Sequence, residues 1–235
     1  RMISRLATAR LPIAKGVERE KVARAPALGR GTSIGESARG DRVLQDVVEG
    51  FVAKLDDGGK PRAKVALACA QDPITPGLGA VSDDGARALV MACQAMHGEA
   101  SLVLVDFAGV RATAVRSFDG AGWVVGGFLG DKVVCLVQRL GDEPTFSVWL
   151  GDKCVCSVAG LQQPCVPARV SNEVLALVVC PKPDELTLTG PSSLCALDVT
   201  SGALAPLAPA SGTRVTARAG ELVVDGGSER VTVKI

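Results

Sequence analysis

An internal repeat is the feature of this sequence that most restricts its fold. Residues 79–117 read as four short apolar strands separated by turns that contain acidic residues and glycine, and the same outline recurs before and after this stretch. The ends of the third strands lie about 45 to 50 residues apart, at Leu55, Val105, Leu150 and Leu197. Four strands per unit with tight glycine turns favour a β-propeller, because no segment shows a sustained helical period of apolar residues.

The repeat divides the chain into a basic N-terminal segment, residues 1–27, and a single propeller-like domain, residues 28–235. The expected units are residues 28–74, 75–118, 119–160 and 161–208, followed by a partial unit of three strands at 209–235. Because an open sheet edge invites pairing with other chains, the partial unit needs a fourth strand, and Ser4–Ile13 is the candidate. We therefore expect an all-β propeller of about five four-stranded antiparallel blades. A β-sandwich would give similarly spaced strands and is the alternative.

The strand and turn pattern also resembles a known class of propeller. The phrase AVSDDGARALVMA, followed by SLVLVDFAG, is similar to blades of the TolB-like and YVTN-like families, and SSLCALDVTSGALAPL is similar again. The likeness extends over about residues 28–205, whereas the signatures of WD repeats and of quinone-binding propellers are absent. Such families imply protein binding or recognition of a small ligand, with enzymes in the minority.

The N-terminal segment is rich in basic residues. Its first fifteen residues contain no acid, which is typical of an organellar transit peptide, although an arm that docks on the domain or on a partner would have the same composition. The candidate partner-binding side chains are those of Arg5, Arg10, Lys15, Arg19, Lys21 and Arg24. The segment has no interleaved aromatic residues and the net charge of the chain is only +1, so specific recognition of nucleic acid is not expected.

The eight cysteines bear on the redox compartment. Seven stand in apolar, strand-like runs, where a free thiol behaves as a small hydrophobic group, so we expect reduced thiols in an intracellular protein. Their even number also permits disulfides, for example between Cys180 and Cys195 on neighbouring strands. Cys154, Cys156 and Cys165 form the only cluster, and alternation along a strand would place the first two on one face. A zinc site usually has a CxxC knuckle or paired histidines, and neither is present, so no metal is expected.

The acidic residues and the single histidine indicate no catalytic site. Asp56–Asp57 and Asp83–Asp84 precede glycine, as tight hairpin turns require, so we interpret them as turn residues rather than as calcium ligands. His97 lies in an expected loop, with no pattern of nucleophile and acid around it. We therefore expect no catalytic residue and no cofactor.

These observations lead to one preferred hypothesis and two alternatives. We expect a non-catalytic binding or scaffold subunit of a larger assembly, which contacts other protein subunits through its propeller faces and its basic arm. The apolar runs are shorter than the ~18 residues of a membrane helix, so no transmembrane segment is expected. The expected location is the cytoplasm or an organelle interior, such as that of the mitochondrion.

The first alternative is a small-ligand-binding or hydrolytic propeller with an acidic central mouth that includes Asp84 or Asp131. The second alternative is a secreted or periplasmic sensor module that is held together by disulfides.

Overall fold

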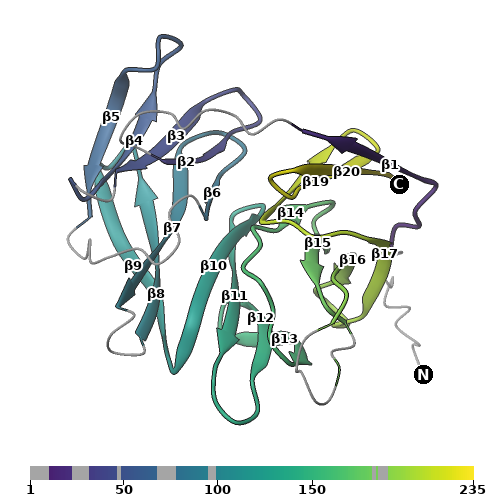
Figure 1. The fold of residues 1–235 in the computed structure, drawn as a ribbon. Helices are drawn as coiled ribbons and strands as arrows, with labels where there is room; N and C mark the ends of the chain where they lie inside the picture. The colour runs from purple at the N-terminus through teal and green to yellow at the C-terminus, as the bar shows by residue number, and fades with distance from the viewer. Residues whose placement is uncertain are drawn as a thin grey trace, which may run out of the picture.

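A computed structural model describes residues 11–22, 32–46, 49–67, 78–94, 99–181, 184 and 190–235. The described residues form twenty strands in five four-stranded antiparallel sheets. Figure 1 shows these sheets arranged as blades around a ring, with β1 and the C-terminus on the same blade. The chain is therefore a five-bladed β-propeller, as the repeat predicts, and the sandwich alternative is wrong. No helix that could span a membrane is found among the described residues.

The strands of each blade are ordered from the centre of the ring outward, and they are given in that order below. The innermost strands of successive blades, from blade 1 to blade 5, contact one another. Blade 1 consists of β2 (Thr32–Glu36), β3 (Arg42–Asp46), β4 (Phe51–Leu55) and β5 (Pro61–Ala66). Blade 2 consists of β6 (Gly79–Val81), β7 (Arg87–Gln94), β8 (Glu99–Asp106) and β9 (Arg111–Asp119). Blade 3 consists of β10 (Ala121–Leu129), β11 (Lys132–Arg139), β12 (Thr145–Leu150) and β13 (Lys153–Ala159). Blade 4 consists of β14 (Ala168–Arg169), β15 (Val174–Val179), β16 (Ser193–Asp198) and β17 (Leu204–Pro209). Blade 5 consists of β18 (Arg214–Arg218), β19 (Glu221–Asp225), β20 (Glu229–Lys234) and, outermost, β1 (Gly16–Lys21).

Aspartate side chains shape the turns between the strands. Asp106 Oδ1 accepts hydrogen bonds of 3.0 and 3.2 Å from two backbone N–H groups of its turn, and Asp198 Oδ1 does the same in blade 4 at 2.8 and 3.3 Å. Asp84 Oδ1 accepts a hydrogen bond of 2.6 Å from the Ser82 hydroxyl, and Asp56 Oδ1 accepts one of 2.8 Å from a turn N–H group. The acid-and-glycine sequences therefore serve as turns, as expected.

The blades pack against one another through aliphatic side chains in three clusters. The largest cluster joins blades 2, 3 and 4, a second joins blades 1 and 2, and a third joins blades 4 and 5. Among the described residues, no apolar cluster joins blade 5 to blade 1. The ring is closed differently at that junction.

Main-chain pairing and one arginine close the ring. β1 pairs antiparallel with β20 and so completes blade 5, from Gly16 opposite Lys234 to Lys21 opposite Glu229. Arg214 on β18 donates a hydrogen bond of 2.7 Å from Nη2 to the carbonyl oxygen of residue 34 on β2, and this bond joins the innermost strands of blades 5 and 1. Closure by an N-terminal strand is therefore confirmed.

The closing strand lies at Gly16–Lys21 and not at the expected Ser4–Ile13, of which residues 4–10 are outside the described part of the chain. Apolar alternation does not reveal β1, because its sequence is GVEREK and every side chain after Gly16 is exposed. A charged edge strand is held by main-chain hydrogen bonds and needs no apolar face.

Two glycines of β10 lie where neighbouring blades approach closely. A Cβ atom on Gly127 would lie 2.6 Å from Cγ of Pro167, and one on Gly126 would lie 2.8 Å from the Leu102 side chain. These two glycines therefore permit close packing of an innermost strand.

A β-bulge recurs in the outer strand of four blades. The pairing register shifts at Arg62 in β5, Val115 in β9, Val155 in β13 and Leu207 in β17. β1 pairs with β20 without such a shift. Because a bulge inserts one extra residue, the residues before and after it face opposite sides of the sheet instead of the same side.

Candidate binding site between blades 2 and 3

The structure describes three of the six basic residues that the sequence offers as partner contacts. Arg19 forms an ion pair of 3.0 Å with Glu229 and donates a hydrogen bond of 2.6 Å to the carbonyl oxygen of Pro209, so it fastens β1 to its own propeller. The side chains of Lys15 and Lys21 are exposed. Outside the described residues lie Arg5, Arg10 and Arg24, as well as His97.

The acidic residues of the proposed central mouth are engaged in other contacts. Asp131 pairs with Arg87 at 3.3 Å and so links blade 3 to blade 2. Asp83 pairs at 2.8 Å with Arg169 of blade 4, while Asp84 accepts hydrogen bonds within its own turn. These carboxylates link blades or hold turns.

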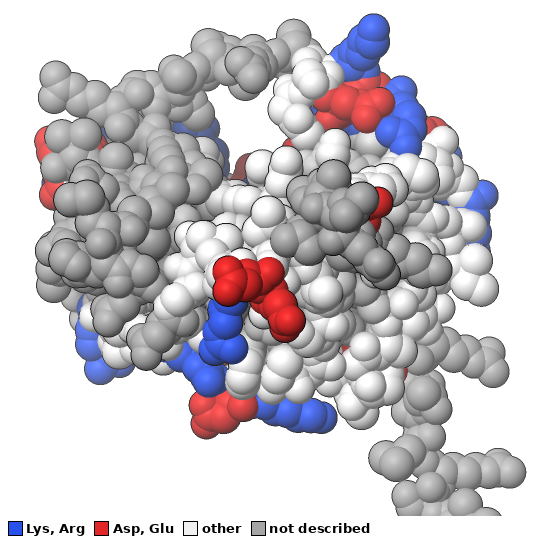
Figure 2. Space-filling model, turned by 60° about the horizontal axis from the view of Figure 1, so that its bottom comes forward, with Lys and Arg blue, Asp and Glu red and all other residues white. Residues whose placement is uncertain are grey.

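The charge pattern on the face shown in Figure 2 is mixed. Among the described residues drawn there, acidic and basic side chains lie next to one another on a mainly uncharged surface. No group of three or more His, Cys, Asp or Glu residues in the described part of the chain is arranged to hold a metal ion.

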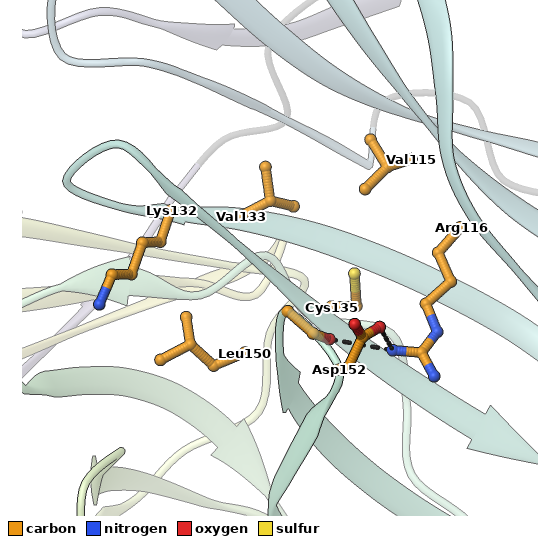
Figure 3. Close-up of a pocket in the computed structure, with 8 residues that line it drawn as sticks. Val115, Arg116, Lys132, Val133, Cys135, Leu150 and Asp152 are labelled. Atoms are coloured by element: carbon orange, nitrogen blue, oxygen red, sulfur yellow. Dashed lines mark hydrogen bonds and ion pairs between the residues drawn. The ribbon is translucent and has the colours of Figure 1, made fainter.

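A cavity of about 480 Å³ lies between the outer strand of blade 2 and blade 3. It is lined by Val115 and Arg116 of β9, by Lys132, Val133 and Cys135 of β11, and by Leu150, Gly151 and Asp152 where β12 turns into β13. Val133, Cys135 and Leu150 form the floor of the cavity. Figure 3 shows them between the two cationic side chains, Lys132 at one end and Arg116 at the other. The site therefore combines an aliphatic floor with charged groups at its ends.

Arg116 is fixed in place by its neighbours. Its Nη1 donates a hydrogen bond of 2.9 Å to the carbonyl oxygen of Gly151, and the guanidinium lies 4.8 and 4.6 Å from the ring centroids of Phe118 and Trp149. The same Nη1 lies 3.4 Å from Oδ1 of Asp152, whose side chain is fully exposed. Because solvent screens an exposed pair at this distance, the contact with Asp152 is weak and easily exchanged.

The bulge at Val115 directs Arg116 toward blade 3. Arg116 pairs with Leu102 while Ala114 pairs with Val103, so these two residues of β9 face opposite sides of the sheet. Leu102 belongs to the cluster shared with blade 3, and Val103 belongs to the cluster shared with blade 1. Strict alternation would have placed Arg116 on the side of Ala114, away from the cavity.

Lys132 supplies the second positive charge. Its side chain is exposed, and it makes no hydrogen bond or ion pair with any described residue. The lining therefore contains two cations, Arg116 and Lys132, and one carboxylate, Asp152, so that it carries one net positive charge.

Cys135 contributes a protonated thiol to the floor of the cavity. Burial raises the pKa of Cys135 to about 11, and the nearby charge of Arg116 opposes this rise only in part. The thiolate is the reactive form of cysteine, so at neutral pH this side chain acts as an apolar group.

The bulge at Val155 changes the interpretation of the cysteines in blade 3. Cys154 pairs with Trp149 and Cys156 pairs with Val148, and these partners are consecutive residues of β12. The two cysteines therefore face opposite sides of the sheet, and the prediction that they share a face is wrong.

The six cysteines whose side chains the structure describes are free thiols. They include Cys180, directly after β15, and Cys195 on the neighbouring β16, which the sequence offers as a candidate disulfide pair. Burial raises the pKa of Cys165 and of Cys195 to about 12, so both are protonated at neutral pH. Cys154 is the exposed member of this described set.

Sequence reasoning does not find the cavity, because its lining comes from three segments of two blades. Arg116 stands in the strand sequence ATAVRS, which is not a known binding motif. Alternation along the strand predicts the wrong face of the sheet for Arg116, because the bulge at Val115 moves this side chain to the opposite face.

No protein-family model matches the sequence, and no curated protein matches it. Among solved structures, the tricorn protease is similar with a TM-score of 0.55 and 10% identity, over 88% of this chain and 25% of that chain. The β-propeller domain of the Trilobed protease from Pyrococcus furiosus has a TM-score of 0.51 and 10% identity, over 83% of this chain and 64% of that chain. TolB from Acinetobacter baumannii is 16% identical, with a TM-score of 0.44, over 83% of this chain and 55% of that chain.

The chain thus spans about half of TolB and a quarter of the tricorn protease. At these identities the likenesses show the fold alone, and they confirm that the blade pattern in the sequence is that of a β-propeller.

Proposed function

We propose that this chain is a non-catalytic binding subunit that contacts another protein through the cavity between blades 2 and 3. The observation that carries the proposal is an apolar cavity whose lining has one net positive charge and a guanidinium fixed by stacking. An apolar hollow with a few placed polar groups is the usual form of a ligand site. Because the Cys135 thiol is protonated, it supports binding there and not nucleophilic catalysis.

An exposed apolar side chain at the cavity favours a protein partner. Val115, which lines the cavity at the bulge, is 38% exposed. A partner that covers the cavity would remove this side chain from water, which is favourable.

The basic N-terminal segment is a second proposed contact. Lys15 and Lys21 are exposed, whereas Arg19 is engaged with Glu229, so Arg19 contributes to the ring more than to a partner. The other members of the proposed set are Arg5, Arg10 and Arg24. The mixed charge of the face in Figure 2 supports a protein partner over a nucleic acid, and the free thiols support an intracellular location.

An affinity pull-down with paired variants of the full chain tests the proposal. Val115→Asp puts a charge into the cavity, whereas Val110→Asp places the same charge on the same hairpin outside it. We expect quantitative mass spectrometry to find a protein that is captured by the wild type and by Val110→Asp and is lost with Val115→Asp. Equal capture of every protein by all three chains would overturn the proposal. Circular dichroism establishes that both variants are folded.

A further inference from the structure

On the basis of the proposed function, we infer that the cavity receives the C-terminal residue of a partner chain and that this residue is aliphatic. The carboxylate of the terminal residue pairs with Arg116 and is attracted by the charge of Lys132, and its side chain lies on Val133, Leu150 and Cys135. The net charge of the lining, the nature of its floor and the size of the cavity carry the inference.

Charge complementarity favours one carboxylate. Arg116 already has a partner in Asp152, whereas Lys132 has none among the described residues, so the lining lacks one negative charge. A single carboxylate supplies it. The exposed Asp152 marks the type of group to which Nη1 of Arg116 donates a hydrogen bond, and a ligand carboxylate can replace it at small cost.

The floor favours an aliphatic side chain. Val133 and Leu150 are half-buried, and Cys135 is buried and protonated, so a branched alkyl group is the complementary surface. The volume of about 480 Å³ falls within the range of about 300–1,000 Å³ that is usual for small-ligand pockets. A cavity of this size admits a chain end and not a helix or a sheet edge.

The cationic side chains and the aliphatic floor belong to one cavity, and this arrangement favours binding of a chain terminus over binding of an internal acidic residue. In an extended peptide, neighbouring side chains point to opposite sides, so an internal acid and the aliphatic residue beside it cannot both enter the cavity. An acid two residues away is on the same side but lies about 7 Å further along the strand. A C-terminal residue carries its carboxylate and its side chain on the same Cα atom. It therefore presents both groups to one cavity.

The test uses the full chain and an array of immobilised random heptapeptides with free C-termini, next to the same array with C-terminal amides. We expect bound peptides to be enriched in Val, Leu or Ile at the last position and the amidated array to lose them. The best peptide is then measured by fluorescence polarisation against point variants.

Two variants move the affinity in opposite directions. Lys132→Met removes the unpaired cation and should weaken binding about twofold to fivefold, whereas Asp152→Asn removes the competing carboxylate and should tighten binding by about threefold. Lys153→Met, which changes an exposed lysine outside the cavity, should leave the affinity unchanged. An affinity that responds to neither Lys132→Met nor Asp152→Asn would overturn the inference.

Three further results would also overturn it: no peptide bound, equal binding of amidated peptides, or equal binding of an amidated peptide with an internal Glu-Leu pair. Binding of 4-methylpentanoate as tightly as the best peptide would assign the cavity to a small acid instead. If Val115→Asp still abolishes capture of a protein in the pull-down, these results refute the terminal carboxylate and leave the proposed function standing. Retention of that protein by Val115→Asp refutes the proposed function itself.

Discussion

Val110 adopts a backbone conformation that is rare for a β-branched residue. Its φ is +47°, in the left-handed region, and it is the described non-glycine residue with a positive φ. The equivalent turn of blade 4 has Gly202 with φ +77°, four residues after Asp198, as Val110 is four residues after Asp106. Blade 2 therefore holds a strained residue where blade 4 has the residue that suits the turn.

Replacing Val110 by glycine should stabilise the protein. The left-handed conformation costs a β-branched residue about 1–2 kcal/mol, and the greater freedom of glycine in the unfolded chain offsets part of this gain. We expect the free energy of unfolding in urea to rise by about 0.5–1 kcal/mol. Thr113→Gly, in an exposed and extended part of β9, should lower it by a similar amount. A loss of stability in Val110→Gly would show that the turn is not strained.

The turn at Asp84 should contribute to stability in a pH-dependent way. The hydrogen bond from the Ser82 hydroxyl, helped by the N–H group of Ala86, lowers the pKa of Asp84 in the folded state. The stabilisation is therefore fully present above the pKa of the unfolded chain, about 3.9, and is lost as the pH falls through the lower folded value. We expect the wild type to be more stable than Asp84→Asn in urea at pH 7 and the difference to shrink below about pH 4. A difference that is constant from pH 7 to pH 3 would contradict this account.

At the scale of the strand, Gly127 of β10 sets how closely blades 3 and 4 approach. Gly127→Ala would bring a methyl group to within 2.6 Å of the Pro167 ring, which is rigid and buried, so we expect a loss of about 1–3 kcal/mol in unfolding free energy. Gly16→Ala is the matched control, because the nearest atom to its new methyl group is 3.9 Å away. That variant should change stability by no more than about 0.5 kcal/mol. Equal effects of the two substitutions would show that the close approach is not what requires glycine.

Local chemistry decides which elements the sequence reveals. The aspartate–glycine turns are found because the side-chain hydrogen bonds that form them are local, as in the turn that follows Asp106. β1 is not found because its exposed face carries no apolar pattern. The alternation of apolar and polar residues does not reveal the bulge at Val115. The orientation of Arg116, and therefore the cavity, cannot be predicted without that bulge. Contacts between blades require the positions of both chain segments, and no local pattern encodes them.

At the scale of the whole ring, the junction between blades 5 and 1 depends on β1 more than on apolar packing. Removing residues 1–10 leaves β1 intact and should preserve stability, whereas removing residues 1–22 deletes β1 and exposes the edge of β20. We expect the longer deletion to cost roughly 3 kcal/mol or more, equivalent to a fall of about 6–12 °C in the unfolding midpoint. Sedimentation should detect association through the exposed edge. An unchanged midpoint would show that the ring does not need this strand.

Because β1 pairs with β20, blade 5 can be completed only at the end of synthesis. β1 is made before every other described strand, and β20 is made after them, so Arg19 and Glu229 are separated by 210 residues of chain. Blades 1 to 4 can form from neighbouring strands as they leave the ribosome, whereas β1 stays unpaired until β20 has been synthesised. An apolar segment in that position would pair with the edge of any blade that formed first. The charged side chains of β1, which are exposed in the complete ring, also keep this segment soluble until β20 has been synthesised.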